Sequence, residues 1–355
     1  MSLLTYLLTV HLAIISFNYC KFFPMANKCA LISGITGQDG AYLAKLLLDN
    51  GYQVIGSSRD PLSSNTFNLE RLSIRNEIDL ISLTPNDLGS VLKALSRIQP
   101  TEIYNLSGLT SVSYSFEQPF EAFHSIAIAT TNYLEAIRQT DPSIKFFNAG
   151  SSECFGTIST DDVSREGSPF KPNSPYAVAK AASYWTVDNY RRSYGLYCCT
   201  GILGNHESPL RPERFVTQKI VNAAINIRLG RQIGLSLGNV DIWRDWGWAE
   251  DYVHAMHLML QQKTARDYVI ATGKTHSLLD FADRVFSYCG LQLNDHLIID
   301  SQLYRPSDIS YSALDPSLIF HDLGWSATVS FPEIAQLMVK YSTFGCQSAW
   351  QSAAT

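Results

Sequence analysis

Tyr176 and Lys180 are the residues whose types and spacing point most directly to chemistry. They lie four positions apart in SPYAVAK (residues 174–180), which we expect to open a helix. On a helix this spacing puts both side chains on one face, about one turn apart. A nearby ammonium stabilises phenolate, so Lys180 would lower the pKa of Tyr176 from roughly 10 toward the range of a base at neutral pH. The Tyr-x-x-x-Lys pair alone is weak evidence for a catalytic site. A Ser-Ser-Glu segment upstream, at residues 151–153, strengthens that interpretation.

A glycine-rich turn further upstream predicts a dinucleotide site. The apolar run Cys29–Ser33 is typical of a buried parallel strand, and it leads into GITGQDG (residues 34–40) and a helical pattern that Asn50-Gly51 stops. In this context glycines let the backbone approach a pyrophosphate, and the N–H groups that begin the helix face it. The spacing is G-x-x-G-x-x-G rather than G-x-G-x-x-G. We expect cofactor contacts from Gly34, Thr36, Gly37, Gln38, Asp39 and Gly40.

The end of the second expected strand, Gln53–Ile55, bears on the choice of cofactor. An NAD site usually carries an acid here, which binds the ribose 2′-hydroxyl. In this chain Gly56-Ser57-Ser58 is small and neutral, and Arg59, which suits a 2′-phosphate, comes before Asp60. The pattern favours NADP, while Asp60 leaves NAD open.

The elements that must position these residues alternate between strand and helix, which predicts an α/β fold with a doubly wound parallel sheet of the Rossmann type. Further strands are expected at Ile103–Leu106, Lys145–Ala149 and Tyr197–Ile202, and helices at about 120–138 and 175–194. Beyond residue 202 the pattern loosens, as expected for a smaller C-terminal lobe that binds substrate. The expected division is residues 25–202 for the NADP-binding domain, 203–345 mainly for the lobe with 241–273 returning to the core, and 346–355 for a tail.

Composition is that of a soluble, cytoplasmic enzyme. A chain of 355 residues that is 46% hydrophobic with a net charge of −5 can bury one large core or two linked ones. It has no basic run that would attract nucleic acid. The seven cysteines lack metal-ligand spacing and are expected to be mostly buried thiols in a reducing compartment. No metal is expected.

The first 24 residues form a separate segment. Residues 1–20 carry no charge and are rich in Leu, Ile and Val, and Lys21 and Pro24 close the segment. The length permits a membrane span, but polar residues interrupt it and no basic n-region precedes it. We rank an upstream start-site artefact or a disordered extension as the first interpretation of this segment and a membrane anchor as the second. Membrane contact is expected only if the segment is an anchor. Met25 would be a natural start.

Motifs along the chain make it similar to the extended short-chain dehydrogenase/reductases, and within these to the GDP-mannose 4,6-dehydratases. The resemblance covers about residues 28–325. It is carried by GITGQDG (34–40), NLSGLTSVSYSFEQP (105–119), SSE (151–153), SPYAVAK (174–180), NHESP (205–209), RDWG (244–247), YVIATG (268–273) and YRP (304–306). GITGQDG and SPYAVAK occur across the superfamily, whereas NHESP with RDWG is more specific to the GDP-mannose enzymes.

The resemblance implies conversion of GDP-D-mannose to GDP-4-dehydro-6-deoxy-D-mannose. Tyr176 would take the proton of the 4-hydroxyl as hydride leaves C4 for NADP, and Ser151 would hydrogen-bond the developing keto oxygen. Glu153 would remove the C5 proton and donate a proton as the 6-hydroxyl leaves as water. Hydride would return to C6, so the cofactor is regenerated. Lys180 completes the implied catalytic set.

Other roles are implied where the motifs match. Cofactor contacts are implied for Arg59, Leu106, Ser107, Tyr176, Lys180, His206 and Arg211. Sugar-nucleotide contacts are implied for Asn205, Lys219, Arg244 and Arg305. Members of the family also imply a homo-oligomer, either a dimer or a tetramer.

The chain departs from the family pattern at several positions. Members often have Arg-Arg at two places where this chain has Arg59-Asp60 and Leu210-Arg211. An Asp that commonly binds the adenine is replaced near Ser82, and the segment 290–304 is shorter than in many members. Two alternatives therefore stay open. One is a related GDP-sugar reductase or epimerase, and the other is a non-catalytic protein that binds NADP or a sugar nucleotide. The intact catalytic set argues against the second, because a binding module has no use for a tyrosine base.

Overall fold

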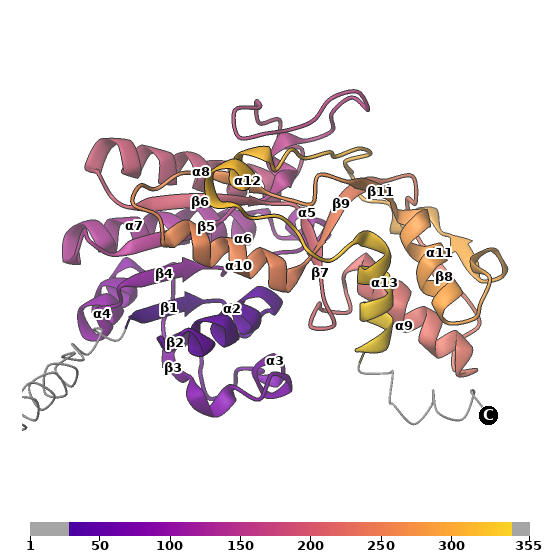
Figure 1. Ribbon diagram of the computed structural model, residues 1–355, viewed down its shortest axis with the longest axis horizontal. Coiled ribbons are helices and arrows are strands. Elements are labelled where there is room, and N and C mark those ends of the chain that lie inside the picture. The colour runs from indigo at the N-terminus through magenta and orange to yellow at the C-terminus, as the bar shows by residue number, and fades with distance from the viewer. Residues whose placement is uncertain (1–27, 343–355) are drawn as a thin grey trace, which may run out of the picture.

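A seven-stranded parallel sheet forms the centre of the computed structural model, which describes residues 28–342 (Figure 1). The expectations for residues 1–24 and 346–355 lie outside the described residues. The strand order is β10-β6-β5-β4-β1-β2-β3, so the chain reverses its direction of travel across the sheet between β1 and β4. The strands are β1 (Cys29–Ser33), β2 (Gln53–Ser58), β3 (Asp79–Ser82), β4 (Glu102–Asn105), β5 (Lys145–Ala149), β6 (Cys198–Leu203) and β10 (Tyr268–Ile270).

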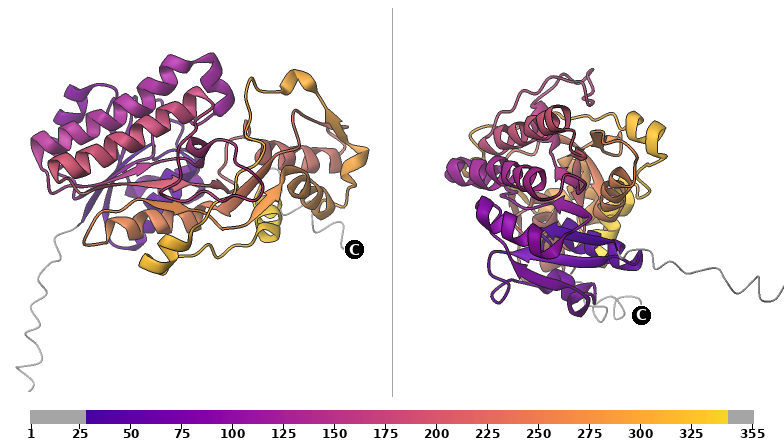
Figure 2. Two further views of the ribbon diagram at one scale, coloured as in Figure 1. Left: turned by 90° about the horizontal axis from the view of Figure 1, so that it is seen from above. Right: turned by 90° about the vertical axis from the view of Figure 1, so that its left-hand side faces the viewer.

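Helices cover both faces of this sheet, which confirms the expected doubly wound arrangement (Figure 1, Figure 2). One face packs on α2 (Gln38–Asp49), α10 (Ala249–Leu260) and α12 (Ser317–Leu323). The other packs on α4 (Leu88–Ile98), α7 (Ala129–Thr140) and α8 (Pro175–Tyr194). Shorter helices are α3 (Phe67–Arg71), α5 (Val112–Glu117), α6 (Pro119–Phe123), a π-helical turn (His124–Ile128) and 3₁₀ turns at Arg75–Glu77, Ser152–Phe155, Leu293–Asp295 and Ser301–Leu303. Strands buried on both faces account for the apolar runs in the sequence.

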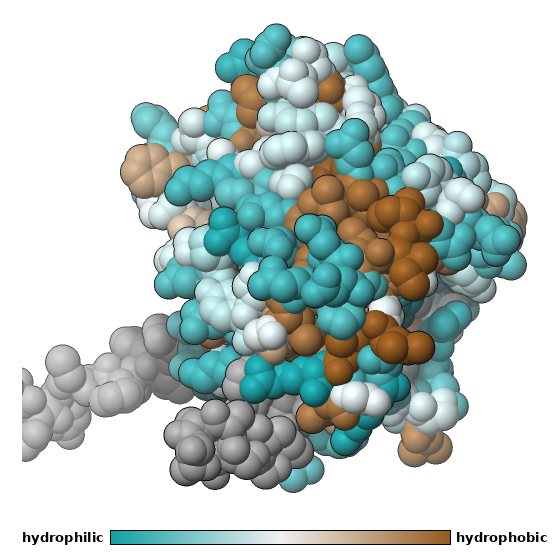
Figure 3. All heavy atoms as spheres, turned by 90° about the vertical axis from the view of Figure 1, so that its right-hand side faces the viewer, coloured by the Kyte–Doolittle hydropathy of each residue, from teal (hydrophilic) through white to brown (hydrophobic). Residues whose placement is uncertain are grey.

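A second core lies in a lobe beside the sheet (Figure 2). Its helices are α9 (Val216–Arg228), α11 (Leu278–Tyr288) and α13 (Phe331–Lys340). Its small sheets are β11-β9-β7, made of β7 (Asn205–Glu207), β9 (Trp243–Trp248) and β11 (Thr275–Ser277), and β12-β8, made of β8 (Leu235–Leu237) and β12 (Leu297–Ile299). Figure 3 shows apolar side chains gathered on the outer face of the molecule at this end.

Several expected boundaries move by a few residues. β2 runs three residues past the expected Ile55, because Ser57 and Ser58 still pair in register with β1 and β3. The expected helix at 120–138 is α6, the π turn and α7 in succession. Of the segment 241–273, α10 and β10 pack into the main sheet region, whereas β9 pairs with β7 and β11 in the lobe.

Two further properties concern the described part of the chain. Between residues 28 and 342, no helix combines the length and the apolar character that crossing a bilayer requires. The cysteines of this range, at positions 29, 154, 198, 199 and 289, are buried free thiols, as expected.

Candidate active site

Two adjoining cavities open at the carboxyl ends of the parallel strands, where the chain reverses between β1 and β4. This switch point is where open α/β sheets bind ligands. One cavity of about 780 Å³ follows the glycine turn and the ends of β2 and β4. The other, of about 480 Å³, lies between the end of β5, the start of α8 and the lobe. We call them the glycine-turn cavity and the central cavity.

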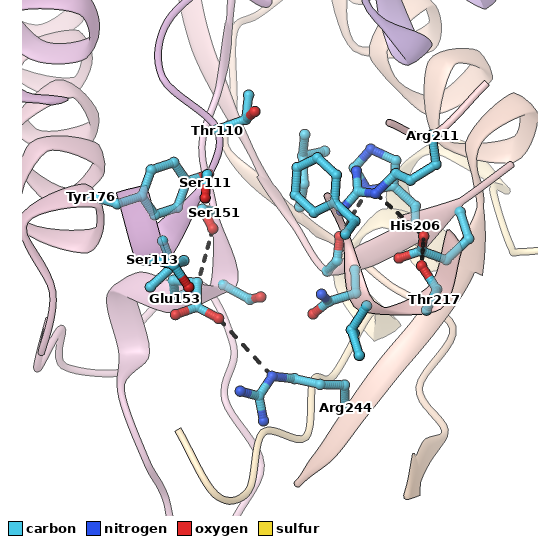
Figure 4. A pocket seen from close by; sticks show the side chains of 18 of the residues that line it. Thr110, Ser111, Ser113, Ser151, Glu153, Tyr176, His206, Arg211, Thr217 and Arg244 are labelled. Carbon is cyan, nitrogen blue, oxygen red and sulfur yellow. Dashed lines mark hydrogen bonds and ion pairs between the residues drawn. The ribbon is translucent and has the colours of Figure 1, made fainter. Parts of the chain in front are cut away.

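One side of the central cavity, the catalytic wall, comes from β5 and α8 (Figure 4). Ser151 follows β5, and its hydroxyl accepts from the Glu153 N–H at 3.3 Å, which caps a 3₁₀ turn. Ser174 caps α8 and Pro175 occupies its first turn, so Tyr176 begins the helix facing the cavity. The structure thus brings all four expected catalytic residues to one surface, with Lys180 completing the set.

The expected lowering of the pKa of Tyr176 is wrong for this structure. Burial raises the pKa of Tyr176 well above 10, the Ser151 hydroxyl opposes this, and the charge of Glu153 adds to it. The Lys180 Nζ lies 5.8 Å from the Tyr176 ring centroid and donates to the Ala149 carbonyl at 2.6 Å. Burial also lowers the pKa of Lys180 to about 8. The ammonium is therefore a weakened partner of the phenol because it is buried and bonded elsewhere.

Glu153 faces arginines of the opposite side, which we call the lobe wall. Its Oε1 lies 4.0 Å from Arg244 Nε, as the dashed line in Figure 4 marks, and Arg244 Nη2 lies 3.4 Å from Asp308. Burial raises the pKa of Glu153, while Arg244 and then Arg305 oppose the rise. A raised pKa moves a buried carboxyl toward the range in which general acids and bases work.

The glycine turn has the shape that a dinucleotide requires. Gly34 has φ +86°, and a Cβ on Gly40 would lie 2.3 Å from the Gly34 carbonyl oxygen. α2 begins after Gly37 with no side-chain cap, so its first N–H groups face the glycine-turn cavity. The cavity is lined by all six residues expected from the motif, and by Arg59, Leu106 and Ser107. These features fit a dinucleotide.

Arg59 and Asp60 differ in where their side chains lie. Arg59 lines the glycine-turn cavity. Asp60 caps its own turn: its carboxylate accepts from the Leu62 N–H at 3.0 Å and from the Ser63 hydroxyl at 2.7 Å. Ser82 at the end of β3 donates to the Arg59 carbonyl at 3.1 Å, which fixes this backbone. The Asp60 carboxylate is therefore engaged within its own turn, whereas the Arg59 side chain borders the cavity.

His206 joins the glycine turn to the lobe. Its Nε2 lies 3.0 Å from Asp39 Oδ2, its Nδ1 bonds the Gly204 carbonyl at 2.8 Å, and its ring stacks on Tyr252. Burial opposes ionisation of both partners, but their pairing lowers the pKa of Asp39 to about 2 and raises the pKa of His206. The pair is therefore charged at mildly acidic pH and holds the two regions together.

Comparisons with known proteins agree on one family. A sequence profile described as GDP-mannose 4,6 dehydratase matches residues 31–338. GDP-mannose 4,6 dehydratase 1 of Arabidopsis thaliana is 43% identical over 323 residues, which cover 88% of this chain and 89% of that protein. The GDP-mannose 4,6-dehydratase of Vibrio cholerae serotype O1 is 38% identical, with coverages of 89% and 93%. The chain belongs to the GDP-mannose 4,6-dehydratase family.

Solved structures outside this family share its fold. A Thermus thermophilus UDP-glucose 4-epimerase complex with NAD has a TM-score of 0.78 and 23% identity over 88% of this chain and 98% of its own. RMD from Pseudomonas aeruginosa complexed with NADPH has a TM-score of 0.72 and 18% identity over 92% and 98%. At these identities the likeness shows the fold alone.

The other residues expected from the family differ in whether they line a cavity. Asn205, Arg244 and Arg305 line the central cavity, and His206 and Arg211 border it as well. Lys219 does not: it is exposed on α9 and is not among the lining residues of either cavity. The helix turns Thr217 and Gln218 inward instead, and the hydroxyl of Thr217 bonds the Glu207 carboxylate at 2.6 Å.

Sequence reasoning missed several lining residues. Thr110, Ser111 and Tyr114 follow β4, and Arg214 and Phe215 precede α9, and all of them border both cavities. The small polar loop after β4 was a usable signal for the first group, because ligands bind where strands end. No comparable signal marked Arg214, whose place depends on contact between loops about 100 residues apart in the chain.

Proposed function

We propose that this protein converts GDP-D-mannose to GDP-4-dehydro-6-deoxy-D-mannose, by oxidation at C4, loss of water across C5–C6, and hydride return to C6 together with delivery of a proton to C5. It is an enzyme, a hydro-lyase of the short-chain dehydrogenase/reductase type, and it uses a nicotinamide cofactor. The observation that carries the proposal is Glu153 in one cavity with Ser151 and Tyr176. Oxidation alone needs a base and an oxyanion partner, whereas elimination needs a further acid–base group.

The first step uses Tyr176 and Ser151. Bound NADP would supply the hydride acceptor and donor, and every other role belongs to the chain. Tyr176 accepts the proton of the sugar 4-hydroxyl, and Ser151 donates a hydrogen bond to the same oxygen as it becomes a ketone. Because burial keeps Tyr176 a phenol in the free cavity, filling the site has to favour its ionised form, with Lys180 as the nearby ammonium.

The second step uses Glu153. The 4-keto group acidifies the C5 hydrogen, and the Glu153 carboxylate takes that proton. The same group, now a carboxylic acid, donates the proton to the 6-hydroxyl as it leaves as water. A raised pKa suits both halves, because the carboxyl must bind and release one proton in each turnover. Arg244, at 4.0 Å, keeps its ionised form accessible.

Binding of the sugar nucleotide is proposed for Asn205, Arg244 and Arg305, since guanidinium groups form paired, charge-assisted bonds with a diphosphate. The expected direct contact of Lys219 is not retained, because its side chain is exposed outside both cavities. His206 and Arg211 are proposed to face the cofactor, as expected.

NADP is proposed over NAD. Arg59 borders the cavity, whereas the Asp60 carboxylate is bonded within its own turn and does not line the cavity. Calorimetry with both nucleotides on the apo protein tests this. Tighter NADP binding is expected, and equal or reversed affinities would mean that Asp60 turns toward the ribose. A cytoplasmic homo-oligomer, dimer or tetramer, stays a prediction.

Mass spectrometry of the product tests the reaction directly. Purified protein incubated with GDP-mannose should give a product that has lost one water, with no net consumption of NADPH. A stoichiometric fall in NADPH absorbance without that product would assign a reductase, and a product of unchanged mass would assign an epimerase. Binding without any product would assign a non-catalytic protein.

A further inference from the structure

Arg214 lies where the two cavities meet. It stands in the loop between β7 and α9, and with Arg211 and Phe215 it borders both the glycine-turn cavity and the central cavity. Arg211 and Arg214 are the cationic side chains that the two cavities share among residues 28–342. A cation at this junction can reach a ligand in either cavity.

The two arginines are held together by one aromatic ring. The Arg211 Cζ lies 3.9 Å and the Arg214 Cζ 5.0 Å from the centroid of the Phe215 ring. Such cation–π contacts fix the position of a long, flexible side chain. Both guanidinium groups are therefore presented from one short loop at residues 211–215, Arg211 half-buried and Arg214 exposed.

The positive charge at the junction is only partly balanced. Arg211 Nε lies 3.3 Å from the buried Glu207 carboxylate, which also accepts the hydroxyl of Thr217. Arg214 makes no ion pair within residues 28–342, and its Nη2 donates to the neutral hydroxyl of Thr110 at 3.2 Å. Burial, followed by the charge of Arg211, lowers the pKa of Arg214. Arg211 has the Glu207 carboxylate as a partner while the neighbouring Arg214 has none among the described residues, and two adjacent cations with one carboxylate between them favour an added anion.

We propose that Arg214, positioned by Phe215 beside Arg211, binds a phosphate of a nucleotide ligand where the two cavities meet. The Arg214–Thr110 hydrogen bond joins the loop after β4 to the loop before α9, so it also ties together the elements on either side of that ligand. The proposal rests on the proposed function, which requires two diphosphates nearby, one from the cofactor and one from the sugar nucleotide. In this proposal Arg214 is a phosphate-binding residue.

Equilibrium binding of NADP and of GDP to Arg214→Ala shows which of the two ligands supplies the phosphate that Arg214 binds. The measurement needs no turnover. A lost bond to a charged group should weaken one ligand on the order of 10- to 100-fold and reduce its sensitivity to salt. Weaker NADP binding assigns the phosphate to the cofactor, and weaker GDP binding assigns it to the sugar nucleotide. Arg214→Lys, which keeps the charge, should recover part of the loss. The matched control is Arg231→Ala, an exposed arginine that borders neither cavity.

Thr110→Val tests the bridge between the loops. It should speed dissociation of the same ligand several-fold, and adding it to Arg214→Ala should have little further effect, because both remove one interaction. The proposal is overturned if Arg214→Ala and Arg231→Ala bind both ligands like the wild type. If the wild-type protein itself binds neither ligand, the proposed function fails instead. Circular dichroism melting of each variant separates lost binding from lost folding.

Discussion

The two walls of the central cavity are built in different ways. The catalytic wall comes from one strand–helix unit, residues 145–194, in which helix caps set Ser151, Glu153 and Tyr176 side by side. The lobe wall is assembled from distant segments, with Arg211, Arg244 and Arg305 each arriving from a different part of the lobe. Its arginines are tied to acids such as Glu207 and Asp308. This difference implies that changes on the catalytic wall affect chemistry, while changes on the lobe wall affect binding and stability.

The largest effect should come from Tyr176→Phe on the catalytic wall. Removing the base for oxidation should lower the turnover rate by about 10²–10⁴-fold, while GDP binding stays near the wild-type value. Steady-state rates and GDP affinity measure the two effects. Tyr184→Phe on the same helix, outside both cavities, is the matched control. A parallel loss of GDP affinity would break the separation between the walls.

Arg244→Gln on the lobe wall should act mainly on binding. Loss of a charged hydrogen-bond donor should weaken GDP-mannose binding about 10- to 100-fold. Since Arg244 opposes the raised pKa of Glu153, its removal should raise that pKa further. The acidic limb of the rate profile should therefore move to higher pH. Arg266→Gln, an exposed arginine paired with Asp322, is the control. Unchanged affinity with a lower rate would place Arg244 with the chemistry.

The fall of the turnover rate at alkaline pH should reflect deprotonation of Lys180. Burial lowers its pKa to about 8, so the ammonium that supports ionised Tyr176 is present below that pH and is lost above it. The rate should then fall as pH rises beyond about 8, by up to about tenfold per unit for one required proton. A flat profile between pH 8 and pH 10 would show that the ammonium is dispensable.

The smallest effect should come from Asp39→Asn, which breaks the pair between the glycine turn and the lobe. The pKa of Asp39 is lowered to about 2, so its contribution is present above pH 4 and is lost as pH falls through about 2. The pKa of His206 is raised, so its contribution is complete below about pH 6.5 and is lost as pH rises through the folded value.

The melting temperatures of Asp39→Asn and wild type should therefore differ most between about pH 4 and pH 6.5. Thermal melts across that range measure the difference. Asp49→Asn at the exposed end of α2 is the control. A difference that grows toward pH 8 would contradict a charged pair.

The contrast between the walls also decides what could be predicted from the sequence. β1, the glycine turn, β5 and α8 follow from local patterns: an apolar run, glycines where a Cβ would collide, and a Ser-Pro helix start. The catalytic wall lies within this local unit, so the motifs located it. The pKa of Tyr176 did not follow, because burial by surrounding elements outweighs a lysine one turn away.

The lobe wall was less accessible to sequence reasoning. Arg214 and Lys219 show why: which side of the chain faces the cavity depends on how α9 packs in the second core, and no local pattern records it. Resemblance to the family supplied Arg244 and Arg305, which line the central cavity, and also Lys219, which is exposed and lines neither cavity. Long-range contacts, such as Arg214 with Thr110, are set by the folded arrangement of loops.

A single-turnover experiment on Glu153→Gln tests the central claim that this carboxyl serves elimination rather than oxidation. The variant keeps the shape of the side chain but cannot accept the C5 proton. After mixing with GDP-mannose, the absorbance of enzyme-bound NADPH should rise and persist, and solvent deuterium should not enter C5. Normal turnover, or a block of cofactor reduction as complete as that in Tyr176→Phe, would contradict the account.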